Sequence, residues 1–141
     1  MVKPFIYIAG PLFNSHERAY LEQIAQALDN AGFRTFLPHR DVGLLGATQL
    51  TVQDRVAIFH GDLAALDRCD MCVALLTGAD QDSGTSAELG FMFARGKPCF
   101  GLSDDFRWLN NMIWGICGEG TRIARTIPEL VNLITHSHGT V

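Results

Sequence analysis

The chain has 141 residues, of which 48% are hydrophobic, and its formal net charge is −4. This length and composition predict one domain with one core over residues 1–135, followed by a disordered polar tail over residues 136–141. The acidic balance, with Lys and Arg scattered along the chain, argues against nucleic acid and anionic membranes as partners. The apolar run at residues 5–9 is too short to span a membrane, so we expect a cytoplasmic protein.

Short apolar runs alternate with helical patterns along the chain. Strands are predicted at residues 3–9, 33–37, 71–76, 97–102 and 122–124. Helices are predicted at residues 15–31, 52–68, 89–96, 110–117 and 127–135. We expect Asn14 or Ser15 to cap the first helix, and residues 39–51 to form a long loop of the kind that often contributes to a binding site.

The alternation of strands and helices is typical of a parallel sheet covered by helices. It predicts a single doubly wound α/β domain, flavodoxin- or Rossmann-like, with a mostly parallel sheet of about five strands and helices on both faces. Ligands of such folds bind beyond the carboxyl ends of the strands. Tyr7, Phe13, Asp82 and Glu88 all lie at or just after predicted strands, and we therefore expect them near one crevice.

The four cysteines do not have the pattern of a disulfide framework. Cys69 and Cys72 show the C-x-x-C spacing, but they lead into an apolar strand instead of opening a helix, which a redox pair would need. Cys99 and Cys117 do not supply the second pair of a zinc site. The sequence therefore predicts four buried free thiols and no metal site.

Residues 82–90, with the sequence DSGTSAELG, connect the third strand to a helix. The segment has two interpretations. Thr85 and Glu88 fit a capping box, in which the glutamate only closes the start of the helix. Alternatively, Glu88 lies in the crevice close to the Tyr7 hydroxyl and to Asp82. A carboxylate there can act as a nucleophile on an anomeric carbon, while a second carboxyl group assists the leaving group.

Several motifs also resemble those of the nucleoside 2-deoxyribosyltransferase family, in the same order and over roughly residues 5–115. They are Tyr7 with AGPLF at residues 9–13, GDL at 61–63, DSGT at 82–85, ELG at 88–90, GKP at 96–98 and NNM at 110–112. The resemblance implies double displacement on 2′-deoxynucleosides and free nucleobases without a metal or organic cofactor. It also implies a homo-oligomer whose sites are completed by a neighbouring subunit.

The resemblance assigns catalytic roles to three residues. Glu88 would be the nucleophile that attacks C1′ of the deoxynucleoside, and Tyr7 would hold and tune its carboxylate. Asp82 would contact the nucleobase and help its ring nitrogen gain and lose a proton. From the residues alone, the alternative is a strand residue with its ring in the core.

The remaining matched positions are substrate-binding: Gly10, Phe13, Asp62, Gly84, Asn110 and Met112. Asp62 would support the base or the sugar, and Phe13 would pack against the base. Asn110, with Met112 beside it, would reach the 5′ end of the sugar in a neighbouring subunit's site. The structural alternatives are a solvated helix acid for Asp62, plain core for Phe13 and a helix cap for Asn110.

Two other functions fit the same architecture. A 2′-deoxynucleoside 5′-monophosphate N-glycosidase would share the fold and the glutamate but needs phosphate-binding residues in the first loop. That loop, residues 9–13, is apolar, although Arg40 or Arg107 could supply phosphate contacts. A non-catalytic nucleotide-binding module would use Glu88 only as a cap.

Overall fold

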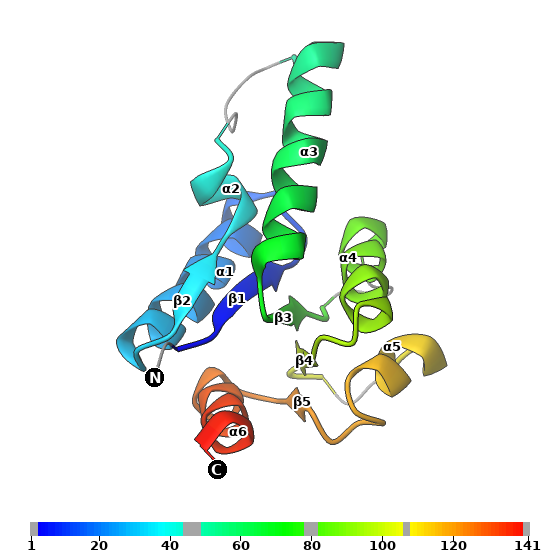
Figure 1. Ribbon diagram of the computed structural model, residues 1–141. Coiled ribbons are helices and arrows are strands. Elements are labelled where there is room, and N and C mark those ends of the chain that lie inside the picture. The colour runs from blue at the N-terminus through cyan, green and yellow to red at the C-terminus, as the bar shows by residue number, and fades with distance from the viewer. Residues whose placement is uncertain (1–2, 44–48, 78–81, 106–107, 140–141) are drawn as a thin grey trace.

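A computed structural model describes residues 3–43, 49–77, 82–105 and 108–139 (Figure 1). The strands are β1 (Phe5–Ala9), β2 (Arg34–Phe36), β3 (Met71–Leu75), β4 (Cys99–Leu102) and β5 (Ile123–Ala124). The helices are α1 (Ser15–Asn30), α2 (Pro38–Asp41), α3 (Val52–Arg68), α4 (Ser83–Ala94), α5 (Asn111–Ile116) and α6 (Ile127–Gly139).

All five strands pair in parallel in one sheet, in the order β2-β1-β3-β4-β5. Helices α1 and α6 cover one face of this sheet, and α3, α4 and α5 cover the other (Figure 1). The predicted doubly wound α/β fold is therefore confirmed. Strand β2 lies on one side of β1, and β3 lies on the other side, so the strand order reverses between β1 and β3. The carboxyl ends of these two strands therefore border the place where such folds bind ligands.

The two faces of the sheet carry side chains of different size, since successive residues of a strand point to opposite faces. Toward α1 and α6 the strands present large apolar side chains, namely Ile6, Ile8, Val73, Leu75, Phe100 and Leu102. Toward α3 and α4 they present mostly small ones, namely Ala9, Cys72, Ala74 and Cys99, together with Tyr7. The small side chains let α4 approach the sheet closely and bring its side chains over Tyr7.

Three elements differ from the prediction. The predicted loop at 39–51 begins with the short helix α2, because Pro38 at the first helical position favours helical backbone; residues 44–48 lie outside the described part. Helix α4 begins at Ser83, six residues before the predicted start at residue 89. Helix α6 continues to Gly139, so residues 136–139, which were expected to form a tail, belong to this helix. Side chains in its last turns bond back to the helix, as when Thr135 Oγ1 donates to Val131 O at 2.7 Å.

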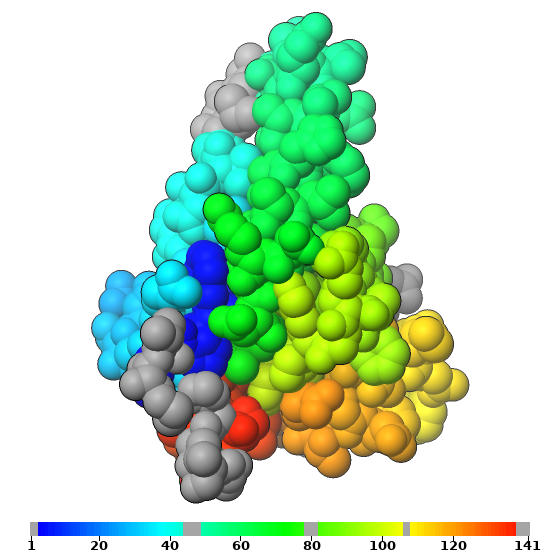
Figure 2. All heavy atoms as spheres, in the orientation of Figure 1, coloured from blue at the N-terminus to red at the C-terminus, as the bar shows by residue number. Residues whose placement is uncertain are grey.

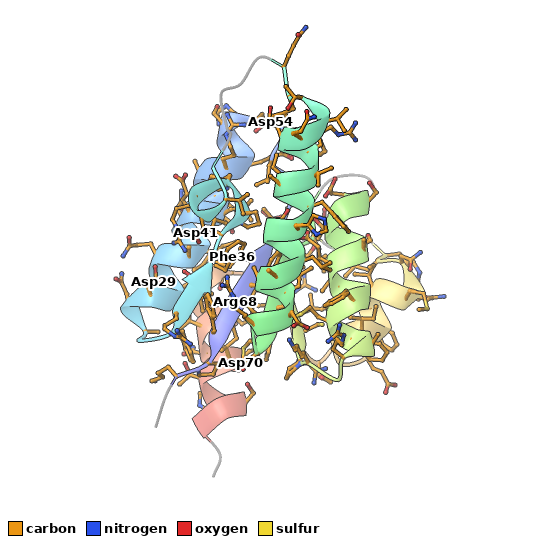
Figure 3. The ribbon with its side chains drawn as sticks, turned by 45° about the horizontal axis from the view of Figure 1, so that its top comes forward. Asp29, Phe36, Asp41, Asp54, Arg68 and Asp70 are labelled. Carbon is orange, nitrogen blue, oxygen red and sulfur yellow. The ribbon has the colours of Figure 1, made fainter. Side chains whose placement is uncertain are left out.

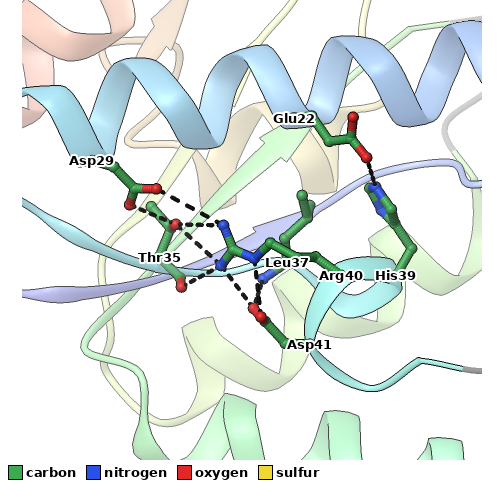
Figure 4. A network of polar contacts seen from close by, with 7 residues as sticks. All are labelled: Glu22, Asp29, Thr35, Leu37, His39, Arg40 and Asp41. Carbon is green, nitrogen blue, oxygen red and sulfur yellow. Dashed lines mark hydrogen bonds and ion pairs between the residues drawn. The ribbon is translucent and has the colours of Figure 1, made fainter.

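A polar network holds α2 against β2 and α1 (Figure 4). Arg40 Nη2 donates to the Thr35 carbonyl and lies in an ion pair with Asp41 Oδ2, each at 2.7 Å. His39 Nε2 lies 2.9 Å from Glu22 Oε1 on α1. Every carboxylate in this network has a cation or a donor beside it, so the network serves to fix the β2–α2 corner.

Helix α3 stands along the outside of the molecule, and its N-terminal half extends beyond the sheet (Figures 1 and 2). Thr51 and Asp54 form a capping box at its start, and Arg68 lies in its last turn (Figure 3).

No helix within the described residues is long and apolar enough to cross a membrane. All four cysteines are buried and free, as predicted, and burial raises the pKa of the Cys69 thiol to about 12.

Candidate active site

Helix α4 carries Glu88 to a position above β1. Asp82 caps the helix, because its Oδ2 accepts hydrogen bonds from the Thr85 N–H at 3.0 Å and from Thr85 Oγ1 at 3.1 Å. Glu88 therefore lies in the second turn of α4 and not at the third position after a cap. The alternative in which Thr85 and Glu88 form a capping box is wrong, and the Glu88 carboxylate is free to point elsewhere.

The Glu88 carboxylate meets the hydroxyl of Tyr7. Tyr7 is fully buried, and its O–H donates a hydrogen bond to Glu88 Oε2. Its ring stacks on Phe36, the last residue of β2, with 5.4 Å between the ring centroids and 23° between their planes; Phe36 is labelled in Figure 3. Tyr7 is thus locked by packing on the strand side and presents only its hydroxyl to the glutamate.

A cleft of about 450 Å³ opens above this pair. Six residues predicted from the sequence line it: Gly10, Phe13, Asp62, Asp82, Gly84 and Glu88. The cleft is large enough for a small organic ligand. Phe13 lies at its rim with 79% of its surface exposed, so it is not the plain core residue of the alternative interpretation.

The apolar walls of the cleft were not among the residues predicted from the sequence. They consist of Leu12, Pro38, Phe59, Leu63, Leu66, Ala87 and Phe91. Phe59, Leu63 and Leu66 lie on the same face of α3 as Asp62, and Ala87 and Phe91 flank Glu88 on α4. The signal was the i, i+3, i+4, i+7 spacing around each acid, which places neighbours on one helix face.

Gly10 allows the chain to leave β1 close to the underlying helix. A Cβ atom at this position would lie 2.6 Å from Leu21 Cδ2 on α1 and 3.2 Å from Leu75 Cβ. A side chain here would therefore force the Leu21 side chain or the first loop to move. Gly84 has a similar but milder restriction, since its Cβ would lie 3.2 Å from Asp82 Oδ2.

The cleft is acidic, and no cation is found among the described residues that line it. Its described lining includes the three carboxyl groups of Asp62, Asp82 and Glu88 but no Lys, Arg or His. Burial raises the pKa of Glu88 to about 7; the hydrogen bond from Tyr7 opposes this shift, and the charges of Asp62 and Asp82 add to it. Burial also raises the pKa of Asp62 to about 6. Perturbed carboxyl groups gathered in a cleft are typical of active sites.

Tyr7 keeps its proton across the physiological range. Burial, followed by the charge of Glu88 and the hydrogen bond to it, raises the pKa of the phenol far above its usual value. The hydroxyl is therefore a permanent donor to Glu88, which orients one carboxylate oxygen and leaves the other free for chemistry. A half-buried carboxylate held in this way can attack an electrophilic carbon delivered through the cleft.

Asn110 and Met112 do not line this cleft. Asn110 caps α5, and its Oδ1 accepts a hydrogen bond from the Met112 N–H at 2.8 Å. The Met112 side chain is 70% exposed, and the neighbouring Trp108 is 88% exposed. The capping role of Asn110 is thus present within one chain, and neither residue belongs to the chain's own cleft lining.

The sequence of this chain is similar to those of known proteins. Residues 6–138 match the family model of nucleoside 2-deoxyribosyltransferase. An uncharacterized protein of Schizosaccharomyces pombe is 30% identical over 111 residues, which are 74% of this chain and 52% of that protein. The chain therefore spans about half the length of this curated relative.

Solved structures share the fold over nearly the whole chain. A conserved protein from Enterococcus faecalis V583 has a TM-score of 0.83 at 22% identity, covering 96% of this chain and 99% of that one. A 2-deoxyribosyltransferase from Bacillus psychrosaccharolyticus has a TM-score of 0.78 at 25% identity, covering 91% of this chain and 90% of that one. With its match over residues 6–138, this chain belongs to the nucleoside 2-deoxyribosyltransferase family.

Proposed function

We propose that this protein transfers 2-deoxyribose between nucleobases by double displacement, with Glu88 as the nucleophile. The observation that carries the proposal is the half-buried Glu88 carboxylate at the base of a cleft with apolar walls, held there by the Tyr7 hydroxyl. The family supplies the substrate class of 2′-deoxynucleosides and free nucleobases.

In the first half of the reaction, a Glu88 oxygen attacks C1′ of the deoxynucleoside and the nucleobase departs. The positive charge that develops on the sugar is stabilised by the adjacent carboxylate. Tyr7 keeps the attacking carboxylate oriented, and Phe13 at the rim offers an aromatic face to the flat base. Asp82, which lines the same cleft, is a candidate contact for the base.

In the second half, another nucleobase enters the cleft and attacks C1′, which releases Glu88. Attack by water in place of the base gives hydrolysis as a side reaction. The apolar walls formed by Phe59, Leu63 and Phe91 favour a stacked base over water at this step. The residues that carry these steps are side chains of the chain itself, and the proposal invokes no metal or organic cofactor.

The competing 2′-deoxynucleoside 5′-monophosphate N-glycosidase fits the cleft less well. A 5′-phosphate would meet Asp62, Asp82 and Glu88 with no cation among the described lining residues. The Arg40 guanidinium is already engaged by Thr35 and Asp41, and Arg107 lies outside the described residues. A non-catalytic binding module is also less favoured, because Glu88 does not cap α4.

We further propose that the working enzyme is a homo-oligomer. Asn110 and Met112 stand at the exposed start of α5, where they could reach the sugar in a neighbouring subunit's cleft. The exposed Phe13 at the rim of the cleft is consistent with cover supplied by another subunit.

Chromatography of the protein with 2′-deoxyinosine and free adenine tests the proposal. Deoxyadenosine should form with the wild-type protein and not with Glu88→Gln. Release of hypoxanthine without deoxyadenosine would indicate a hydrolase, and deoxynucleoside monophosphates would then be compared. No reaction with purine or pyrimidine deoxynucleosides, from a folded protein, would favour the binding module.

A further inference from the structure

A second cavity, of about 410 Å³, lies where α5 meets the segments that follow β4 and β5 (Figure 1). It shares no described lining residue with the cleft above Glu88. Its volume suits a small organic ligand, and the carboxyl ends of parallel strands form the edge at which such sheets bind ligands. Its polar and aromatic lining residues are Ser103, Asp105, Trp108, Asn111, Trp114 and Arg125.

Two tryptophans form the aromatic walls of this cavity, and the chain has no others. The Trp114 indole is seated against the turn at Gly120, where a Cβ atom would lie 2.5 Å from the indole Nε1. The Gly120 N–H donates to the Trp114 carbonyl at 3.1 Å, and the φ of 85° at Gly120 is one that glycine adopts without strain. Trp114 is therefore positioned by the fold itself, whereas Trp108 is 88% exposed and offers its indole to a ligand.

The polar groups of the cavity indicate the class of ligand. Ser103, buried directly after β4, donates from Oγ to Asp105 Oδ1 at 3.5 Å. Asp105 and Arg125 bring one acid and one guanidinium to the lining, and Asn111 adds an amide that can both donate and accept. A simple anion would be repelled by Asp105, and an organic cation would be repelled by Arg125. A neutral ring with donors and acceptors along its edge can use these groups while its face stacks on an indole.

We propose that this cavity, named here the tryptophan pocket after Trp108 and Trp114, is a second binding site that takes a nucleobase ring, either free or within a nucleoside. One face of the ring stacks on an indole, and its polar edge meets Asp105, Asn111 and Arg125. Binding in the tryptophan pocket goes beyond the proposed function, because it takes place in a cavity that Glu88 does not line and involves no bond that forms or breaks.

Tryptophan fluorescence reports on this pocket directly, because both tryptophans line it and neither lines the cleft. Wild-type protein is titrated with adenine, with excitation beyond the absorption of the base. We expect saturable quenching by adenine and little quenching by choline or inorganic phosphate, which serve as the cation and the anion. The same titration of Glu88→Gln, with adenine and with 2′-deoxyadenosine, tells whether the pocket takes the free base or the nucleoside.

Matched variants separate the tryptophan pocket from the cleft. Trp108→Ala, followed by the quenching of Trp114, should bind adenine about tenfold or more weakly, because a stacking surface is lost. Asp105→Asn, which keeps both reporters, should weaken binding about threefold or more. Both variants should leave the KM for adenine in transfer unchanged. Phe13→Ala should do the reverse, raising this KM and leaving the quenching midpoint unchanged. Trp108 and Phe13 are largely exposed, so these variants should fold, and circular dichroism checks all three.

Three results would overturn the inference: no saturable quenching by adenine or 2′-deoxyadenosine, an unchanged midpoint in Asp105→Asn, or stronger quenching by choline or phosphate. A higher KM in Trp108→Ala would place Trp108 in a neighbouring subunit's cleft and would overturn it as well. Transfer by wild type without quenching refutes the inference alone. Quenching that responds to Asp105→Asn, without transfer or hydrolysis, supports the inference and refutes the proposed function.

Discussion

Two groups of acidic side chains lie near the same sheet. One group is paired with an arginine, and the other lines a cleft with no cation among its described residues. Around α2, Asp29 and Asp41 are paired with Arg40 (Figure 4). For Asp41, burial acts to raise the pKa, but hydrogen bonds from Arg40 and the Leu37 N–H prevail and lower it. In the cleft, Glu88 and Asp62 have no cation among the lining residues, and burial raises the pKa of both.

The carboxylates around α2 therefore support the fold, whereas those of the cleft remain available to a ligand. A paired acid on the surface stabilises the folded chain slightly, whereas a buried unpaired acid costs stability whenever it ionises. The fold tolerates this cost at Glu88 because the face of the sheet toward α4 carries small side chains and the Tyr7 hydroxyl.

Matched amide substitutions in the two groups should differ most in activity. Glu88→Gln should lower deoxyribosyl transfer by about 10³-fold or more, because it removes the nucleophile. Asp41→Asn should leave transfer within about twofold, since Asp41 lies in the α2 network outside the cleft lining. Initial rates of transfer from 2′-deoxyinosine to adenine measure both. Comparable losses of activity in the two variants would contradict the distinction between the cleft acids and the α2 acids.

The same two variants should change stability with opposite sign. The folded pKa of Glu88 lies above its unfolded value of 4.5, so the folded state loses stability as the pH rises from about 4.5 through about 7. Glu88→Gln should therefore raise the free energy of unfolding at pH 8, by on the order of 3 kcal/mol, and the gain should vanish near pH 4.

Asp41→Asn should instead lower the free energy of unfolding at neutral pH, by less than about 1 kcal/mol. Its folded pKa is lowered, so its contribution is present above the unfolded pKa and is lost as the pH falls through the folded pKa. Urea unfolding at pH 4, 6 and 8 measures both variants. A destabilised Glu88→Gln at pH 8 would show that Glu88 stabilises the fold.

Removal of the Tyr7 hydroxyl tests how the cleft acid is held. Tyr7→Phe should lower kcat/KM at pH 7 by roughly 10- to 100-fold, the cost of one hydrogen bond to a carboxylate. The acid limb of the pH profile should also move to higher pH, because the Tyr7 hydrogen bond lowers the pKa of Glu88. Tyr20, the second of the two tyrosines, offers the matched control Tyr20→Phe, which should leave rate and profile unchanged.

Phe13→Ala should have the smallest effect on the site. Phe13 is 79% exposed at the rim, so its truncation should leave the melting temperature unchanged. The loss of one aromatic contact with the base should raise KM about three- to tenfold with little change in kcat. Phe93→Ala, at a 54% exposed position of α4 outside the cleft lining, serves as the control. A loss of stability without a change in KM would place Phe13 with the core.

Much of the fold and part of the site could be predicted from the sequence. The order of strands and helices follows from periodic apolar residues, and the placement of Tyr7 on β1 and of Asp82 and Glu88 after β3 brings them to one edge of the sheet. The start of α4 could not be predicted, because Asp82 and Thr85 are both suitable caps and only packing against β1 and β3 selects Asp82.

The cleft walls and the short helix α2 could not be predicted from local sequence patterns either. Phe59 and Phe91 become lining residues only because α3 and α4 flank the same space, and this arrangement is tertiary. The burial of Asp62 Oδ1 without a hydrogen-bond partner among the described residues is likewise a property of the assembled cleft, since Asp62 has the sequence pattern of an ordinary solvated helix acid.

Covalent catalysis by Glu88 is tested most directly by trapping the sugar on the protein. A 2′-deoxy-2′-fluoroarabinosyl nucleoside should form a long-lived intermediate, because fluorine destabilises the positive charge needed to break the ester. After proteolysis, mass spectrometry should find the fluorosugar on the peptide that contains Glu88, and on no peptide of Glu88→Gln. A label on another residue, or base release with no label, would contradict covalent catalysis by Glu88.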